Sequence, residues 1–411
     1  MKRSSLGIEG GRLRGSGDAP ARKCWQVLTM LRVLQVTPAL DAGGVERTTI
    51  EVAEAISKAG GLAMVASRGG RLADELAAAG GELVELPLDS KNPIRIWRNA
   101  AALAEIVVRR EISIIHARSR APAWSALWAA RRTNTAFVTT YHGIYNARSA
   151  LKRAYNSVMA KGDMVIANSE YTGAHLRAEH HVDPARVVVI PRGVDLARFD
   201  PPAVDLARKA ALRAAWGLPT EAGDAVVILP ARLTAWKGQT TLIDAARLIE
   251  ARRPGLARYV LAGDPQGRAA YVAALERQIG TAGLGGRVHI VGHVADMPAA
   301  FALADVAAFP SLEPEAFGRG AIEAQAMGLP VVAAAHGGLT ETVVPGVTGL
   351  HVPPGDAAAL AAALEQVLLM EPAQRAAMGR AGQARVRALY STSALQTATL
   401  AVYERVLRER G

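Results

Sequence analysis

Residues 315–341 read EAFGRGAIEAQAMGLPVVAAAHGGLTE. In this stretch Glu315 and Glu323 lie eight positions apart, with a Phe-Gly turn between them. Gly318 and Gly320 predict a loop that turns into a helix after the first carboxylate, so that Glu315 lies in the loop and Glu323 in the helix. The free backbone N–H groups at such a helix start suit phosphate or sugar oxygens. Both carboxylates can then reach one elongated ligand.

Length and composition predict a globular protein with more than one domain. A chain of 411 residues, 50% hydrophobic and 21% charged, is expected to form two or three domains. Cys24 is the single cysteine, which excludes an internal disulfide framework and fits a reducing compartment. No uninterrupted apolar run approaches the roughly 18–20 residues that a membrane-spanning helix needs. We therefore expect a cytoplasmic protein.

Short apolar runs alternate with longer Ala-rich segments along both halves of the chain. Most runs are apolar throughout, which is typical of parallel strands covered on both faces. Strands are expected at 31–37, 62–67, 113–117, 136–140, 164–168 and 187–190, and then at 225–230, 258–263, 287–291, 305–309, 330–334 and 349–352. The predicted fold class is α/β, with two doubly wound, Rossmann-like parallel-sheet domains facing each other across a cleft.

Local composition predicts the domain boundaries. Residues 1–29 are rich in Gly, Arg and Ser and lack the apolar run of a secretory signal, so we expect a disordered extension with Met30 as the natural start. The N-terminal domain is expected at 30–199 and the C-terminal domain at 200–385, because Pro201 and Pro202 interrupt any helix or central strand. Residues 386–411 are expected to form a helix that packs back toward the N-terminal domain.

The formal net charge of +11 is concentrated in the N-terminal half. One interpretation is a solvated basic face. The other is attraction to anionic lipid headgroups or a phosphorylated acceptor, worth roughly 1 kcal/mol per Lys or Arg near such a surface. The segment Asn146–Lys161, with Lys152 and Arg153 beside Leu151, can lie on a membrane or pack against its own domain. Nucleic acid is not expected as a partner, because no binding motif accompanies the charge.

Further motifs follow predicted strands, which is where ligands of such sheets bind. The pair Gly43-Gly44 separates the first strand from a helix, and His142 follows the strand at 136–140. Arg232 and Lys237 follow the strand at 225–230. The sequence holds no Asp-x-Asp motif and no Cys/His cluster, so neither a divalent ion on a diphosphate nor a zinc site is expected.

These motifs resemble the retaining glycosyltransferases of the GT-B fold, specifically glycosyltransferase family 4, over about residues 30–400. Taken alone, the pair of glutamates is ambiguous, because two solvated carboxylates on a surface helix give the same spacing. The ordered sequence of Phe317-Gly318, Met327-Gly328-Leu-Pro330 and Gly337-Gly338 around the pair supports the resemblance.

The resemblance implies a donor site around the two glutamates. Glu323 would hydrogen-bond the ribose of a nucleotide sugar, and Glu315 would orient the donor sugar. Backbone amides around Phe317, Gly318 and Arg319 would contact sugar hydroxyls. The front-face mechanism usually proposed for such enzymes needs no protein nucleophile, because the leaving phosphate accepts the proton of the acceptor hydroxyl.

The resemblance also implies how the donor diphosphate is held. Arg232, Lys237 and the Gly43-Gly44 loop would bind it, and the two fixed cations would stabilise the charge that develops on the departing nucleoside diphosphate without a metal. His142 would position the sugar rather than act as a base.

Residues on the acceptor side are expected in the N-terminal domain. Glu46, Arg118 and Arg120 are predicted to line this side, and the two arginines either meet an acidic acceptor group or are solvated. His116 is a second choice for the role of His142, because it also ends an apolar strand.

The predicted function is a retaining, metal-independent glycosyltransferase without a cofactor, with the nucleoside-diphosphate-sugar as a substrate. The expected acceptor is a hydroxyl of a lipopolysaccharide core, glycolipid or other cell-envelope glycan intermediate, reached from the inner face of the plasma membrane. Two alternatives stay open. One is a nucleotide-sugar epimerase of the same fold, and the other is a catalytically silent nucleotide-sugar-binding protein. The silent protein is expected to have lost Glu315, Glu323, Arg232 or Lys237, and all four are present.

Overall fold

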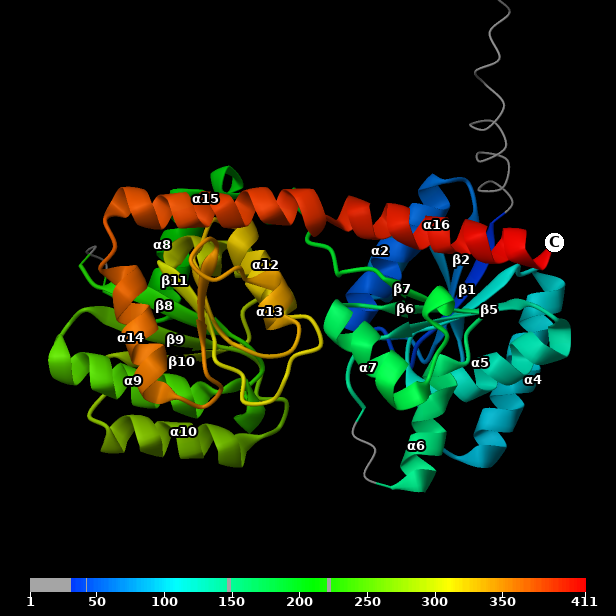
Figure 1. Ribbon diagram of the computed structural model, residues 1–411, viewed down its shortest axis with the longest axis horizontal. Coiled ribbons are helices and arrows are strands. Elements are labelled where there is room, and N and C mark those ends of the chain that lie inside the picture. Colours follow the sequence, from blue (N-terminus) through cyan, green and yellow to red (C-terminus); the bar gives the residue numbers. More distant parts are fainter. Residues whose placement is uncertain (1–30, 42, 146–148, 220–222) are drawn as a thin grey trace, which may run out of the picture.

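The computed structural model describes residues 31–41, 43–145, 149–219 and 223–411. It consists of two α/β domains that lie side by side along the long axis of the molecule (Figure 1). The expected extension at 1–29 and the expected start at Met30 lie outside the described residues. Within the described ranges, no helix combines the length and the apolar character that crossing a bilayer requires.

The N-terminal domain is built on a parallel sheet of seven strands in the order β3-β2-β1-β4-β5-β6-β7. The strands are β1 (Arg32–Val36), β2 (Leu62–Ser67), β3 (Gly81–Glu85), β4 (Ile114–Ala117), β5 (Ala136–Tyr141), β6 (Met164–Ala167) and β7 (Val187–Val189). The helices are α2 (Gly44–Lys58), α3 (Ala73–Ala78), α4 (Pro93–Arg109), α5 (Arg120–Thr133), α6 (Ala150–Asn156), η1 (Ser157–Ala160), α7 (Glu170–His180) and η2 (Pro184–Arg186). In the register, Val36 lies opposite both Ala66 and Ala117, so the central strands end level with one another.

The C-terminal domain has a parallel sheet of six strands in the order β10-β9-β8-β11-β12-β13. The strands are β8 (Ala225–Pro230), β9 (Ala257–Ala262), β10 (Val288–Gly292), β11 (Val306–Phe309), β12 (Val331–Ala334) and β13 (Gly349–Val352). The helices are η3 (Pro201–Ala203), α8 (Leu206–Ala215), η4 (Ala235–Lys237), α9 (Gln239–Arg252), α10 (Ala269–Thr281), α11 (Met297–Leu303), α12 (Arg319–Ala326), α13 (Leu339–Thr342), α14 (Ala357–Leu368) and α15 (Pro372–Leu389).

The strand predictions are confirmed except at β3, which the sequence analysis missed. The central strands β1, β4, β5 and β6 are almost wholly buried, as expected for strands with helices on both faces. β3 lies at the edge of the sheet and exposes Glu82 and Glu85. A half-exposed edge strand carries no continuous apolar run, so the pattern that revealed its neighbours is absent.

Two consecutive helices join the domains. α15 runs along the C-terminal domain, and α16 (Thr392–Arg410) continues along the N-terminal domain (Figure 1). At their junction the backbone N–H of Val194 donates to Tyr390 O at 2.7 Å, and the N–H of Thr392 donates to Val194 O at 3.0 Å. α16 buries Leu395, Val402, Tyr403 and Val406 in the core of the N-terminal domain. Helix α16 therefore completes the hydrophobic core of the N-terminal domain.

Candidate active site

The stretch at 315–341 folds as the glycine pattern predicts. Glu315 lies in the loop after β11, and Glu323 lies inside α12, which begins at Arg319. Gly318, the N-cap of α12, has φ 90°, a left-handed conformation that favours glycine. The backbone N–H of Gly338 donates to Glu315 O at 2.7 Å, and a Cβ at Gly338 would lie 2.4 Å from Phe317 Cα. A side chain at Gly338 would therefore displace the loop that carries Glu315.

Glu315 and Lys237 form an ion pair at the end of the C-terminal sheet. Lys237 Nζ lies 2.8 Å from Glu315 Oε1, and the two side chains are 14% and 11% exposed. Ser311 Oγ donates to the same carboxylate oxygen at 2.5 Å, and Lys237 Nζ lies 4.3 Å from the centre of the Trp236 ring. The lysine is thereby held in a fixed position by the carboxylate and the ring.

Arg232 is exposed at the mouth of the cleft, where its Nη1 lies 3.4 Å from Gln266 Oε1. Across the cleft, Glu46 folds back on Gly43, since a Cβ at Gly43 would lie 2.6 Å from Glu46 Oε2. Burial raises the pKa of Glu46, and the charges of Arg192 and Arg232 offset part of the effect. Arg232 of the C-terminal domain is therefore close enough to Glu46 of the N-terminal domain for its charge to act on this carboxylate.

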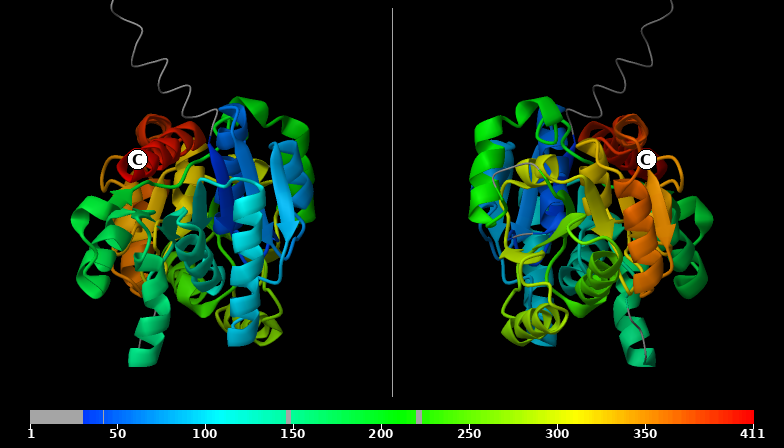
Figure 2. Two further views of the ribbon diagram at one scale, coloured as in Figure 1. Left: turned by 90° about the vertical axis from the view of Figure 1, so that its right-hand side faces the viewer. Right: turned by 90° about the vertical axis from the view of Figure 1, so that its left-hand side faces the viewer.

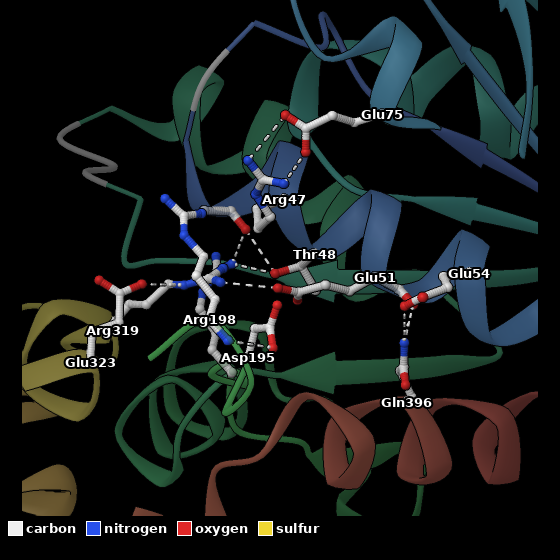
Figure 3. A network of polar contacts seen from close by, with 12 residues as sticks. Arg47, Thr48, Glu51, Glu54, Glu75, Asp195, Arg198, Arg319, Glu323 and Gln396 are labelled. Atoms are coloured by element: carbon white, nitrogen blue, oxygen red, sulfur yellow. Dashed lines mark hydrogen bonds and ion pairs between the residues drawn. The ribbon is translucent and has the colours of Figure 1, made fainter. Parts of the chain in front are cut away.

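Arg319 connects the two domains by a pair of charged contacts (Figure 3). Its Nε donates to Glu323 Oε1 at 3.0 Å, and its Nη2 donates to Glu51 Oε1 on α2, also at 3.0 Å. Arg319 Nη1 and Glu51 Oε2 are buried and have no hydrogen-bond partner within the described residues. Burial raises the pKa of Glu323, and the charge of Arg319 opposes this shift. A cavity of about 830 Å³, lined by this pair and by the Gly43-Gly44 loop, opens between the domains.

His142 is buried and hydrogen-bonded to Arg192, a residue that follows β7. Arg192 Nη2 donates to His142 Nδ1 at 3.0 Å, and Arg192 Nη1 donates to Gly44 O and to Thr48 Oγ1. Burial, together with the charges of Arg192 and Arg118, holds the pKa of His142 well below its usual range. The imidazole is therefore neutral, and because Nδ1 accepts, Nε2 carries the proton. Nε2 is buried and has no hydrogen-bond partner among the described residues.

The other predicted polar residues of the N-terminal domain lie in different surroundings. Arg118 is 2% exposed and donates to Gln35 Oε1 at 2.9 and 2.6 Å, so the alternative of a solvated side chain is wrong for this residue. His116 is fully buried, with one ring nitrogen 2.6 Å from Tyr403 Oη and the other 2.6 Å from Thr140 Oγ1. Both nitrogens of His116 are used within the fold, so this second-choice histidine is structural.

Two more contacts bridge the domains beside the cleft. The carboxylate of Glu341 accepts from the backbone N–H groups of Glu170 and Tyr171, at 2.8 and 2.7 Å. It thereby caps the start of α7 from the other domain. Ser169 Oγ donates to Ala316 O at 2.5 Å. The loop that carries Glu315 is therefore attached directly to the N-terminal domain.

Comparisons with known proteins agree with this geometry. The sequence model of Glycosyltransferase Family 4 matches residues 42–198, and that of Glycosyl transferases group 1 matches residues 213–385. A relative from Jonesia denitrificans, named D-inositol 3-phosphate glycosyltransferase, is 35% identical over 301 residues, 67% of this chain and 68% of that protein. Other relatives of the same name are matched over about half of their length.

The chain belongs to the group 1 glycosyltransferases of family 4. A solved glycosyltransferase from Rickettsia africae aligns with this glycosyltransferase at a TM-score of 0.84 and 34% identity, over 92% of this chain and 99% of that one. Anabaena Alr3699/HepE, solved in complex with UDP and glucose, aligns at a TM-score of 0.78 and 25% identity, over 91% of this chain and 100% of that one. The predicted GT-B fold is confirmed.

Two residues that organise the cleft of this glycosyltransferase are not among the site residues predicted from the sequence. Arg192 ties the Gly43-Gly44 loop to His142, and Glu51 pairs with Arg319 across the domains. Arg192 lies just after a predicted strand, which is a signal that could have selected it. Glu51 lies in the middle of α2, among apolar neighbours, and only the tertiary structure shows its partner.

No group of three or more His, Cys, Asp or Glu side chains in the described residues is placed to hold a metal ion. The predicted independence of this glycosyltransferase from metals and cofactors stays a prediction.

Proposed function

We propose that this glycosyltransferase moves a sugar from a nucleoside-diphosphate-sugar to an acceptor hydroxyl, with retention of configuration and without a metal. The observations that carry the proposal are the ion pair of Lys237 with Glu315 at the end of the C-terminal sheet and the interdomain cavity that Glu323, Arg319 and the Gly43-Gly44 loop line. The UDP and glucose bound to the similar Anabaena protein support a nucleotide-sugar donor.

In this proposal the diphosphate lies between Lys237, Arg232 and the Gly43-Gly44 loop. A cation held in place before the reaction stabilises the charge that develops on the leaving group, because it needs no reorganisation in the transition state. Lys237 fits this role, since Glu315 and Trp236 hold it in position. Glu323 and Arg319 would then contact the ribose, and Glu315 would orient the donor sugar.

His142 would donate a hydrogen bond from Nε2 to a hydroxyl of the donor sugar. A neutral imidazole whose Nδ1 already accepts from Arg192 has no free lone pair for general base catalysis. The proton of the acceptor hydroxyl would therefore pass to the leaving phosphate as the new glycosidic bond forms on the same face of the sugar.

The acceptor we propose is a lipid-linked or cell-envelope glycan intermediate, such as a glycolipid or lipopolysaccharide core, used at the inner face of the membrane. Exposed apolar and basic side chains on α4 and α6 support this choice, among them Trp97, which is 65% exposed, and Leu151, which is 83% exposed. The name of the Jonesia relative favours a second candidate, a soluble phosphorylated polyol.

Product configuration tests the proposed reaction. With an α-configured nucleotide sugar and an accepted hydroxyl compound in excess EDTA, proton NMR is expected to show an α-glycoside and one nucleoside diphosphate per turnover. A β-glycoside would contradict retention, and loss of turnover in EDTA that Mg²⁺ restores would contradict metal independence. Conversion of the nucleotide sugar to its epimer without an acceptor would support the alternative of an epimerase.

A further inference from the structure

A second large cavity lies within the N-terminal domain, apart from the donor residues. Its volume is about 1010 Å³, and it is lined by the start of α5, by α6 and by Ile144 and Tyr145 after β5. Figure 1 shows α4, α5 and α6 gathered at the same end of this domain, and α6 projects from it in both views of Figure 2. Of the site residues predicted from the sequence, Arg120 alone is among the described residues that line this cavity.

The cavity carries positive charge without a neighbouring carboxylate. Lys91, Arg120 and Lys152 line it, and no Asp or Glu is among its described lining residues. Arg120 Nη1 donates to Asn156 Oδ1 at 2.9 Å, and its guanidinium carbon lies 4.0 Å from the centre of the Tyr145 ring. A cation held by an amide and an aromatic face keeps its full charge available, so the cavity suits an anionic group.

The rest of the wall is apolar and aromatic. Trp124, Tyr145, Tyr155 and Leu151 contribute to it, and Trp124 Nε1 donates to Tyr155 O at 3.1 Å, which fixes the indole. Tyr155 Oη and Asn156 Nδ2 are both buried, and neither has a hydrogen-bond partner within the described residues. Leu151 is 83% exposed, so its side chain contributes little hydrophobic stabilisation to the folded chain. The wall therefore offers both an apolar surface and unpartnered polar atoms to a ligand.

The cavity adjoins the catalytic cleft. Ser119 and Arg120 directly follow Arg118 at the end of β4, and Ile144 and Tyr145 follow His142 after β5. A Cβ at Gly143 would lie 3.8 Å from Ala316 Cβ in the donor loop. The segment that forms one wall of the cavity therefore also packs against the loop that carries Glu315.

We propose that this cavity binds the acceptor and that the acceptor is a phosphate-bearing lipid. Its phosphate would pair with Arg120 and Lys152, and its hydrocarbon chain would lie against Trp124, Tyr155 and Leu151. This inference rests on the proposed function, because it assigns the acceptor of the same reaction. Ile94 and Trp97, which are 64% and 65% exposed on the first turns of α4 just after Lys91, extend the apolar surface beyond the cavity. This extension provides a place for a longer chain.

Calorimetric titration of the full chain with three defined probes tests the inference. Dodecyl phosphate below its critical micelle concentration carries both features, glycerol 3-phosphate carries only the phosphate, and dodecyl maltoside carries only the chain. We expect dodecyl phosphate to bind at least roughly tenfold more tightly than either of the other two, because burial of one large apolar side chain already corresponds to about this factor.

Two matched variants locate the binding. Leu151→Glu places a negative charge on an exposed side chain of the cavity wall, and Leu369→Glu makes the same change at a 49% exposed leucine in the other domain. Leu151→Glu is expected to weaken dodecyl phosphate binding roughly tenfold or more, and Leu369→Glu is expected to leave it unchanged. Equal weakening by both variants would overturn the inference, because it would indicate adsorption without a defined site.

Glycerol 3-phosphate binding as tightly as dodecyl phosphate would point to a soluble phosphorylated acceptor, and dodecyl maltoside binding as tightly would remove the role of the cations. Either result overturns the inference, as does the absence of all binding. A titration of each variant with nucleotide sugars is run in parallel. Normal donor binding with no lipid phosphate binding refutes the acceptor site alone, whereas loss of donor binding by the unmodified chain refutes the proposed function.

Discussion

At the scale of single residues, the cleft is organised by side chains whose charge and protonation are fixed by the fold. Lys237 is held between Glu315 and Trp236. His142 is kept neutral by burial and by Arg192. Neither state follows from the residue type alone. The sequence predicted that these residues belong to the cleft, because each follows a strand, but their partners come from elements distant in the chain.

Removing the Lys237 ammonium group tests its proposed role. Lys237→Ala is expected to lower kcat by about 10²–10³, because a fixed cation on the leaving diphosphate acts mainly in the transition state. Steady-state kinetics would measure kcat and KM separately, with Arg277→Ala, an exposed cation on α10, as the control. Unchanged kcat in Lys237→Ala would exclude the lysine from the site.

The buried histidines predict how stability depends on pH. Burial holds the pKa values of His116 and His142 in the folded protein well below the usual range of histidine. Below about pH 6.5 the unfolded chain binds protons that the folded chain does not. The contribution of the two histidines to the free energy of unfolding is therefore fully present above this pH and is lost as the pH decreases. Each histidine contributes a slope of about 1.4 kcal/mol per pH unit.

Chemical denaturation of the wild type and of His116→Gln between about pH 7.5 and pH 5.5 would measure this slope. The variant is expected to lose about 1.4 kcal/mol less stability than the wild type over this pH range, because its unfolded chain takes up one proton fewer. Carboxylates contribute equally to both proteins, so the difference isolates the histidine. Identical slopes would mean that His116 binds a proton in the folded protein as readily as in the unfolded chain.

At the scale of helices and strands, the alternation of apolar runs with Ala-rich segments was sufficient for most of the fold. Twelve of the thirteen described strands coincide with predicted runs because their residues are mostly apolar, whereas the edge strand β3, which carries two exposed glutamates, was missed. Within the site, the loop at Glu315 and the helix at Glu323 follow from Gly318. The Arg319–Glu51 pair could not be predicted, because it depends on how α12 and α2 face each other.

The cap that Glu341 provides for α7 is expected to hold the cleft closed. Glu341→Ala leaves the N–H groups of Glu170 and Tyr171 without an acceptor, at a cost of about 0.5–2 kcal/mol. Small-angle scattering is expected to show a larger radius of gyration than for the wild type. The dissociation constant of the donor is expected to rise several-fold, which corresponds to this loss of free energy. Glu276→Ala on the exposed face of α10 is the control. No change in radius or affinity would contradict a role in closure.

At the scale of the whole molecule, residues of both domains line the cleft, and the helices α15 and α16 run from one domain to the other. α16 completes the core of the N-terminal domain, and Arg319, Ser169 and Glu341 bridge the cleft. Donor residues of one domain are therefore connected to α2 and α7 of the other. We infer that binding of the donor and closure of the domains are coupled through these contacts.

A double-mutant cycle tests this coupling. Arg319→Leu and Glu51→Gln are each expected to weaken donor binding, and the double variant is expected to be weakened by less than the sum, with a coupling energy of about 0.5–3 kcal/mol. Calorimetric dissociation constants of the four proteins give the coupling directly. Strictly additive effects would show that the pair does not act as a unit.

The central claim is that the cleft binds a nucleotide sugar without a metal. Its most direct test is calorimetric titration of the purified full chain in excess EDTA with a panel of UDP-, GDP- and ADP-sugars. We predict that one member of the panel binds, and that Arg319→Leu weakens its binding while Arg277→Ala does not. Failure of every nucleotide sugar to bind in EDTA, together with binding once Mg²⁺ is added, would contradict the claim.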